Sequence, residues 1–119
     1  KLHKETGMPV INRTFLNDIY KKAAEGPQKG LLVFSEKQNV SSDFIGFLGA
    51  IVIEGVETHT RTGFIPLSAK TLKDYGIENC SDLNIPVTHA KICGWYDNEF
   101  GSYVNLLGKL TVYIDKNIP

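Results

Sequence analysis

The sequence predicts an α+β fold in which helices pack on a mixed or antiparallel sheet. Three observations support this class: helical spacing of apolar residues near the start and at the end of the chain, short β-branched runs between them, and glycine and proline at the boundaries. The 119 residues suffice for one domain with a hydrophobic core and are too few for two ordinary domains. One domain over residues 1–119 is therefore expected.

The first predicted element is a helix that follows Asn12, since apolar residues recur behind it at spacings of three and four. Gly26 and Pro27 end this helix, because glycine accepts the left-handed conformation after a helix and proline has no N–H with which to continue one. Residues 30–34 form a nearly continuous apolar run. Such a run predicts a buried strand inside the sheet.

The middle of the chain is less regular. Residues 40–46 predict a brief extended or turn segment, and the β-branched residues 50–53 predict a second strand. Residues 58–86 are polar and interrupted by glycine and proline. One short helix is expected within them, near residues 69–75.

The end of the chain predicts a strand followed by a long helix. Apolar and polar positions partly alternate over residues 87–96, which suits a strand that delivers residues 97–99 to a surface. Apolar side chains then recur at helical spacing over nearly all of the remaining chain, which predicts a long amphipathic C-terminal helix. These side chains are Tyr103, Leu106, Leu107, Leu110, Tyr113 and Ile114.

The composition argues against several classes of partner. Thirteen basic residues balance thirteen acidic ones, so no net charge attracts the chain to nucleic acid or to an anionic membrane surface, and no apolar run approaches the length that crosses a bilayer. Cys80 and Cys93 cannot build a disulfide framework, so free thiols in a reducing cytosol are expected. Residues 1–5 resemble neither a translation start nor a signal peptide, which suggests an interior segment of a longer chain.

A self-contained active site is not evident in the sequence. No G-x-G-x-x-G turn is present for a dinucleotide, and residues 26–30 lack the spacing of a phosphate-binding loop. Cys80, His89 and Cys93 could in principle bind zinc, and either cysteine could pair with His59 or His89 as a nucleophile. Because no close pair of ligands occurs, ordinary thiols are favoured, with no metal site.

Two other polar groups have structural interpretations. Residues 41–43, Ser-Ser-Asp, lack the Gly-x-Ser-x-Gly elbow and favour a turn or a cap. Residues 97–99, Asp-Asn-Glu, precede the predicted C-terminal helix, where short polar side chains accept free N–H groups and carboxylates complement the helix dipole. By residue type alone, helix capping is their expected role.

The string Trp-Tyr-Asp-Asn-Glu-Phe-Gly at residues 95–101 changes that interpretation. It resembles the signature of the glyceraldehyde-3-phosphate dehydrogenase family, erythrose-4-phosphate dehydrogenases included, at the last strand-to-helix junction. Residues 23–31 and 40–44 resemble, in the same order, the end of a catalytic-domain helix and the strand that follows it in that family. The resemblance implies that residues 1–119 are the C-terminal part of such a catalytic domain, without the nucleotide-binding Rossmann domain.

The resemblance also implies a function for the parent protein. It would be an NAD- or NADP-dependent oxidoreductase of glycolytic type that converts a phosphorylated aldehyde to an acyl phosphate through a cysteine thioester. Asn98 matches the asparagine that hydrogen-bonds the nicotinamide carboxamide, and Tyr103 is a second candidate cofactor contact. The family more often has tyrosine one position earlier, where this chain has Ser102. No catalytic residue is carried over, because the family's cysteine and histidine lie N-terminal to the matched region.

Partners and alternatives follow from the same resemblance. Family members are cytoplasmic homotetramers, so the expected partners are the remainder of the chain, identical subunits and the small aldehyde substrate, and exposed apolar patches are expected here. The 119 residues alone should be inactive and should bind no cofactor tightly. Residues 55–86 are longer and more polar than in most relatives, which would reshape a subunit interface or the neighbouring site. The alternative is a non-catalytic binding or structural protein with the same fold.

Overall fold

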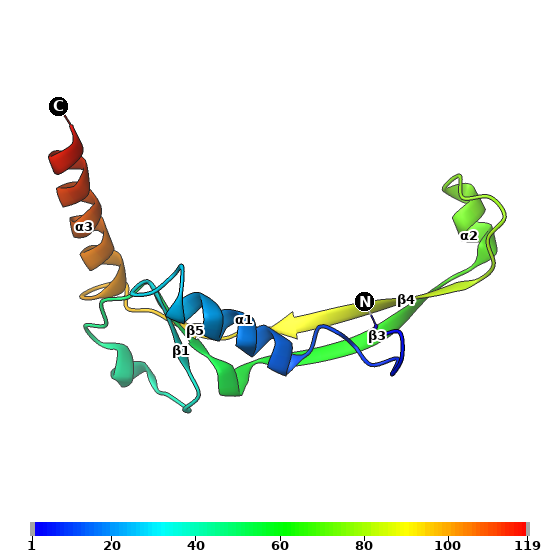
Figure 1. The fold of residues 1–119 in the computed structure, drawn as a ribbon, viewed down its shortest axis with the longest axis horizontal. Coiled ribbons are helices and arrows are strands. Elements are labelled where there is room, and N and C mark those ends of the chain that lie inside the picture. Colours follow the sequence, from blue (N-terminus) through cyan, green and yellow to red (C-terminus); the bar gives the residue numbers. More distant parts are fainter. Residues whose placement is uncertain (1, 119) are drawn as a thin grey trace.

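The computed structural model describes residues 2–118 and has the predicted α+β class, with a mixed sheet, an antiparallel ribbon and helices (Figure 1). The structure is elongated, with dimensions of 61 × 41 × 25 Å. Its radius of gyration is 21.1 Å, whereas a compact domain of this length has a value of about 14 Å. Much of the chain therefore lies at a surface.

Helix α1, Arg13–Glu25, confirms the first predicted helix. The side chain of Asn12 caps its start by accepting a hydrogen bond of 3.0 Å from the N–H of Phe15. At the other end, the N–H of Gly26 donates to the carbonyl of Lys22 at 3.0 Å, and the helix stops there. In Figure 1, α1 lies against strand β1 (Leu32–Ser35).

A three-stranded mixed sheet forms the centre of the structure. Strand β2, Ile51–Glu54, pairs in parallel with β1 and antiparallel with β5, Gly94–Trp95, so the order is β1-β2-β5. The predicted second strand is thus confirmed and takes the central position. Val52 and Ile53 of β2 are almost wholly buried.

The prediction that residues 30–34 lie inside the sheet is wrong. Among residues 2–118, β1 has only β2 as a strand partner and lies at the edge of the sheet. Val33 on this strand is exposed. An apolar run indicates that a segment is buried. Whether it lies at the edge or in the middle of the sheet depends on whether another strand pairs with each of its two sides.

The second sheet is a ribbon of two long strands. Strands β3, His59–Leu67, and β4, Leu83–Lys91, pair antiparallel over their whole length, from His59 opposite Lys91 to Leu67 opposite Leu83. Helix α2, Ala69–Asp74, closes the tip and confirms the short predicted helix. We call β3, α2 and β4 the ribbon. It projects away from the mixed sheet, as Figure 1 shows.

Three sequence-based boundaries need correction. The strand predicted over residues 87–96 is two strands, β4 and β5, which belong to different sheets and are interrupted after Lys91. Residues 41–44 form a short 3-10 helix, in which the Asp43 carboxylate accepts a hydrogen bond of 2.8 Å from the N–H of Val40 and closes a turn. The turn expected from the residue types is therefore confirmed, and the strand implied by the family resemblance at residues 40–44 is wrong. Strand β3 was not predicted, since its first half is polar.

Helix α3, Ser102–Asn117, confirms the long C-terminal helix. It projects from the mixed sheet at the opposite end of the structure from the ribbon tip (Figure 1). Its apolar side chains are largely exposed, among them Tyr103, Leu107 and Leu110. The exposed apolar surface expected from the sequence is therefore present on this helix.

The buried centre contains a carboxylate. Glu54 at the end of β2 is only 3% exposed, and its two oxygens accept hydrogen bonds from the indole Nε1 of Trp95 and, at 2.9 Å, from the N–H of Asn39. The Trp95 ring stacks on Phe44, with ring centroids 5.6 Å apart. Since a buried carboxylate needs partners, these bonds join β5 and the loop at residue 39 to β2.

Replacement of Trp95 by phenylalanine tests this arrangement. Trp95→Phe keeps an aromatic ring near Phe44 but leaves one oxygen of buried Glu54 without its donor. We expect the free energy of unfolding to fall by about 2 kcal/mol, measured by urea denaturation with circular dichroism. Tyr96→Phe, at the exposed neighbouring position, is the matched control and should change it little. Equal stability of the two variants would contradict the structural role of the indole.

Candidate functional site

The candidate site is the loop that leads from β5 into α3. Its anchor is the Asp97 carboxylate. One oxygen accepts a hydrogen bond of 2.6 Å from the N–H of Gly46, and the other accepts from the N–H groups of Glu99 at 2.9 Å and Phe100 at 3.2 Å. Asp97 therefore shapes its own loop and joins it to a segment 51 residues earlier in the chain.

Further bonds hold the start of α3 against the same earlier segment. The N–H of Asp97 donates to the Ser102 hydroxyl at 3.1 Å, and that hydroxyl donates to the carbonyl of Phe47 at 3.4 Å. The Asn105 side chain donates to the carbonyl of Leu48 at 2.8 Å. Ser102 is 2% exposed, so its hydroxyl group lies inside this junction.

Gly101 permits the close approach of these two segments. A Cβ atom built on Gly101 would lie 2.1 Å from the carbonyl oxygen of Phe47, which is far inside van der Waals contact. Glycine is required here for lack of space. The glycine of the sequence string thus has a packing function that the sequence alone did not show.

The hydrogen bonds also set the charge of the loop. The N–H groups of Glu99 and Gly46, followed by those of Phe100 and Gly101, hold the pKa of the Asp97 carboxyl below its ordinary value of 3.8, and partial desolvation offsets only some of this effect. The cause is that these donors bind the ionised carboxylate better than the neutral acid. The loop therefore carries a fixed negative charge at neutral pH.

Asn98 lies next to this anchor and is exposed. Within residues 2–118, no hydrogen bond to its side chain is found, so both the carbonyl and the NH₂ of the carboxamide remain free. Asn98 lines a small pocket of about 110 Å³ together with Ser41, Phe44, Ile45, Tyr96, Asp97 and Glu99. The capping interpretation of residues 97–99 holds for Asp97 as a turn anchor, and the N-cap of α3 is Gly101, without a side-chain bond.

Tyr103, the second predicted cofactor contact, has a different position. It is exposed in the first turn of α3 and lines another pocket, of about 240 Å³, with Leu106, Leu107 and Leu110. The structure does not bring Tyr103 into the pocket of Asn98. Its role toward a cofactor stays a prediction.

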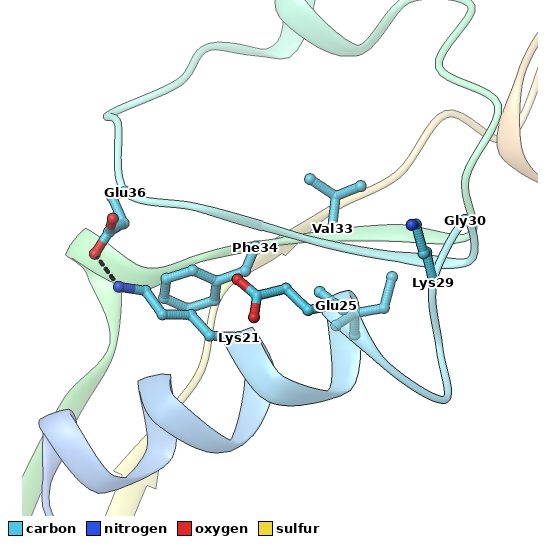
Figure 2. A pocket seen from close by; sticks show the side chains of 9 residues that line it. Lys21, Glu25, Lys29, Gly30, Val33, Phe34 and Glu36 are labelled. Carbon is cyan, nitrogen blue, oxygen red and sulfur yellow. Dashed lines mark hydrogen bonds and ion pairs between the residues drawn. The ribbon is translucent and has the colours of Figure 1, made fainter.

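A larger pocket lies between α1 and β1, as Figure 2 shows. It has a volume of about 430 Å³, and the Lys21 ammonium group crosses it to the Glu36 carboxylate at 2.5 Å. The same ammonium lies 5.5 Å from the centre of the Phe34 ring. The hydrogen bond to the Glu36 carboxylate raises the pKa of Lys21 above its ordinary value, so this amine stays protonated at neutral pH and supplies neither a base nor a nucleophile.

The cysteines and histidines are not gathered into a site. Cys80 follows α2 at the ribbon tip and Cys93 follows β4 at its base, so the length of β4, about 26 Å, separates these two free thiols. No cluster of three potential metal ligands occurs in the part of the chain that the structure describes. Nor is any helix of residues 2–118 both long and apolar enough to span a membrane.

The fold and the loop thus define an α+β protein segment with an exposed carboxamide on an anchored loop, and comparison with known proteins indicates the family. The chain is 31% identical to glyceraldehyde-3-phosphate dehydrogenase 2 of Streptomyces avermitilis over 91% of its own length, and 31% identical to glyceraldehyde-3-phosphate dehydrogenase 2 of Danio rerio over 83%. It is 34% identical to the glyceraldehyde-3-phosphate dehydrogenase of Oncorhynchus mykiss over 79%. The predicted resemblance to the glyceraldehyde-3-phosphate dehydrogenase family is confirmed.

The extent of this similarity is limited. The chain spans about a quarter or less of the length of each relative: 25% of the Streptomyces avermitilis protein, 22% of the Danio rerio protein and 21% of the Oncorhynchus mykiss protein. No protein-family model matches the sequence. The similarity supports a relationship to an oxidoreductase.

Substitution of Gly101 tests the close approach at the junction. Gly101→Ala places a methyl group against the Phe47 carbonyl, and we expect it to lower the free energy of unfolding by about 3 kcal/mol or more. Gly108→Ala is the control, since a Cβ atom at this exposed position in α3 meets nothing within 4 Å and should stabilise the helix by about 1 kcal/mol. Chemical denaturation measures the free energy of unfolding of both variants. Similar effects of Gly101→Ala and Gly108→Ala would disprove the packing argument.

The lowered pKa of Asp97 predicts a dependence of stability on pH. Because the folded state favours the ionised carboxylate, its contribution is fully present above the unfolded-state value near 3.8 and is lost as pH falls through the folded-state pKa below it. Asp97→Asn should therefore be less stable than the parent protein at about pH 6, and the difference should shrink toward about pH 3. Urea midpoints across this range measure it, with Asp74→Asn on exposed α2 as control. A difference independent of pH would contradict the assignment.

Proposed function

We propose that this chain is the C-terminal part of the catalytic domain of an NAD- or NADP-dependent oxidoreductase resembling glyceraldehyde-3-phosphate dehydrogenase. The parent protein would oxidise a phosphorylated aldehyde to an acyl phosphate through a cysteine thioester. The observation that carries the proposal is the free carboxamide of Asn98, presented on a loop that Asp97 and Ser102 hold in place. The confirmed resemblance of the chain to this family supports it.

The chemistry of Asn98 fits a nicotinamide group. A carboxamide offers one acceptor and two donors, and the carboxamide of nicotinamide is the complementary partner. Asn98 is exposed, while the backbone on its N-terminal side is fixed by the bonds of Asp97. The cofactor, when bound, supplies the hydride chemistry. The contribution of this chain would be to orient the ring through Asn98, with Tyr103 on α3 as a proposed second contact.

The remaining chemistry is assigned to other parts of the parent protein. Neither Cys80 nor Cys93 lines the pocket of Asn98, so neither is proposed as the nucleophile. The catalytic cysteine and its histidine would come from preceding segments, and residues 1–119 alone would be inactive. The working protein would be a cytoplasmic homo-oligomer, in which further segments and subunits cover the exposed apolar face of α3.

The first test is activity of the protein as its gene encodes it. Reduction of NAD is followed with glyceraldehyde 3-phosphate and inorganic phosphate, and the intact mass of the same preparation is measured. Activity with a mass well above the 13.2 kDa of this chain supports the proposal. A folded protein that neither binds nor reduces NAD or NADP favours a non-catalytic binding or structural function.

Asn98→Ala tests the specific role of the carboxamide. In the active protein we expect kcat/KM for the nicotinamide cofactor to fall by about tenfold, because one polar contact to the ring is lost. The melting temperature should not change, since the Asn98 side chain makes no hydrogen bond within the described residues. Asn84→Ala on the distant ribbon is the control. Unchanged cofactor kinetics in Asn98→Ala would refute the assignment.

A further inference from the structure

Four basic side chains share one face of the ribbon at its base, the end that joins the mixed sheet through β2 and β5. Directly opposed residues of an antiparallel pair lie on the same face, and so do residues two positions apart along a strand. The register therefore groups two opposed pairs in adjacent rows of one face. These pairs are His59 with Lys91 and Arg61 with His89. We call these four side chains the basic block.

The basic block is closely spaced and open to solvent. All four of its side chains are exposed. The Cβ atoms of an opposed pair are about 5 Å apart, and the next row on the same face lies about 7 Å farther along the strands. Because arginine and lysine have long, flexible stems, the polar groups of the block can reach one ligand above its centre.

No carboxylate neutralises the basic block. Neither β3 nor β4 contains an acidic residue, although acidic and basic residues are equal in number over the whole chain. Among residues 2–118, the only ion pair joins Lys21 to Glu36. Glu57, the carboxylate that precedes β3 in the sequence, lines a pocket with Cys93 and Trp95. The positive charge of the block is therefore uncompensated within the described residues.

This arrangement is unfavourable for the ribbon by itself. Like charges directly opposite each other destabilise a pair of strands, and a two-stranded ribbon is marginally stable in water. Each pair of the block sets a histidine against a side chain that is cationic at neutral pH, so protonation of that histidine creates a like-charge pair. A bound anion offsets the repulsion. The block therefore indicates an anionic ligand.

The opposite face of the ribbon is neutral at the same level. There Thr60 lies opposite Ala90, and Thr62 lies opposite Thr88, with the two threonine hydroxyl groups hydrogen-bonded at 2.7 Å. The positive charge is thus confined to one face of the base. An anion is attracted to that face, and the neutral positions supply matched controls.

The donors of the basic block suit a phosphate group. The arginine side chain offers a planar fork of N–H donors that matches phosphate, lysine adds an ammonium group, and each imidazole donates at least one hydrogen bond. A carboxylate has only two oxygens for four such side chains, whereas a phosphate ester has three strong acceptor oxygens and a larger negative charge. Space beside the block is open at Gly63, where a Cβ atom would meet nothing within 4 Å. The rest of a small phosphate ester would have room there.

We infer that the basic block binds a phosphate group, carried by inorganic phosphate or by a small phosphate ester. Arg61 and Lys91 supply the positive charge, and the two histidines donate hydrogen bonds from the remaining corners of the block. None of the four side chains lines the pocket of Asn98, so the two sites are separate. The inference does not depend on the proposed dehydrogenase function.

Residue-specific labelling of lysine tests the site in the protein as its gene encodes it. Acetylation of each lysine by an amine-reactive ester is followed by mass spectrometry, with inorganic phosphate or with chloride at equal ionic strength. We expect phosphate to slow the acetylation of Lys91 by at least about fivefold, because the bound anion covers its ammonium group. Lys73 on α2 is exposed and should react equally fast in both solutions.

A matched pair of variants separates the basic block from any other phosphate site of the protein. Arg61→Gln should reduce the protection of Lys91 to less than about twofold, since the fork of donors is lost. Thr60→Gln, one residue away on the opposite face, should keep the full protection. The reaction rate of Lys91 in chloride should be the same in both variants, which shows that the ribbon remains folded. Full protection in Arg61→Gln would contradict the assignment.

The same assay distinguishes the two sources of the phosphate group. Inorganic phosphate and glycerol 1-phosphate are compared at equal concentration. Protection of Lys91 by both probes supports recognition of the phosphate group alone, and protection by the ester only supports a phosphate ester as the ligand. If neither probe protects Lys91, or if Lys91 does not react even in chloride because another segment covers it, the inference is overturned.

Discussion

The hydrogen bond between Trp95 and the buried Glu54 carboxylate is the interaction on which the rest of the structure depends. A carboxylate that is 3% exposed must have hydrogen-bond partners, and Glu54 obtains them from the indole of Trp95 and the N–H of Asn39. These bonds bring β5 to β2 over only two residues of strand pairing. The direction in which the chain leaves β5 toward the candidate site follows from this contact.

The candidate loop combines a fixed backbone with a free side chain. Asp97 uses both carboxylate oxygens to hold the backbone of its own loop and of Gly46, while the neighbouring carboxamide of Asn98 remains exposed and unpaired within the described residues. A binding residue benefits from this arrangement, because the backbone of its loop is already ordered and only the side chain loses conformational freedom when a ligand arrives. The glycine at position 101 serves the same end, by letting the start of α3 approach Phe47.

The thin interior explains the shape of the molecule. Only four large apolar side chains are buried in the described chain, at Phe44, Val52, Ile53 and Leu72, while α3 and the ribbon both expose aliphatic surface. Exposed apolar surface on this scale marks contacts with other protein segments. The two surfaces lie at opposite ends of an elongated structure, so different neighbours are expected to cover them (Figure 1).

Local patterns were enough to predict the helices and the loop residues, but not the arrangement of the strands. Asn12 and Gly26 bound α1, and the spacing of apolar residues specified α3, because a helix closes its hydrogen bonds within one segment. The string at residues 95–101 singled out Asn98. The polar start of β3 and the edge position of β1 could not be predicted, since a strand is completed by a partner elsewhere in the chain. The sequence by itself thus determined the helices, the family resemblance and the candidate residue. Only the tertiary structure decided the edge strand, the ribbon and the bond from Gly46 to Asp97, because each of these joins residues that are distant in the chain.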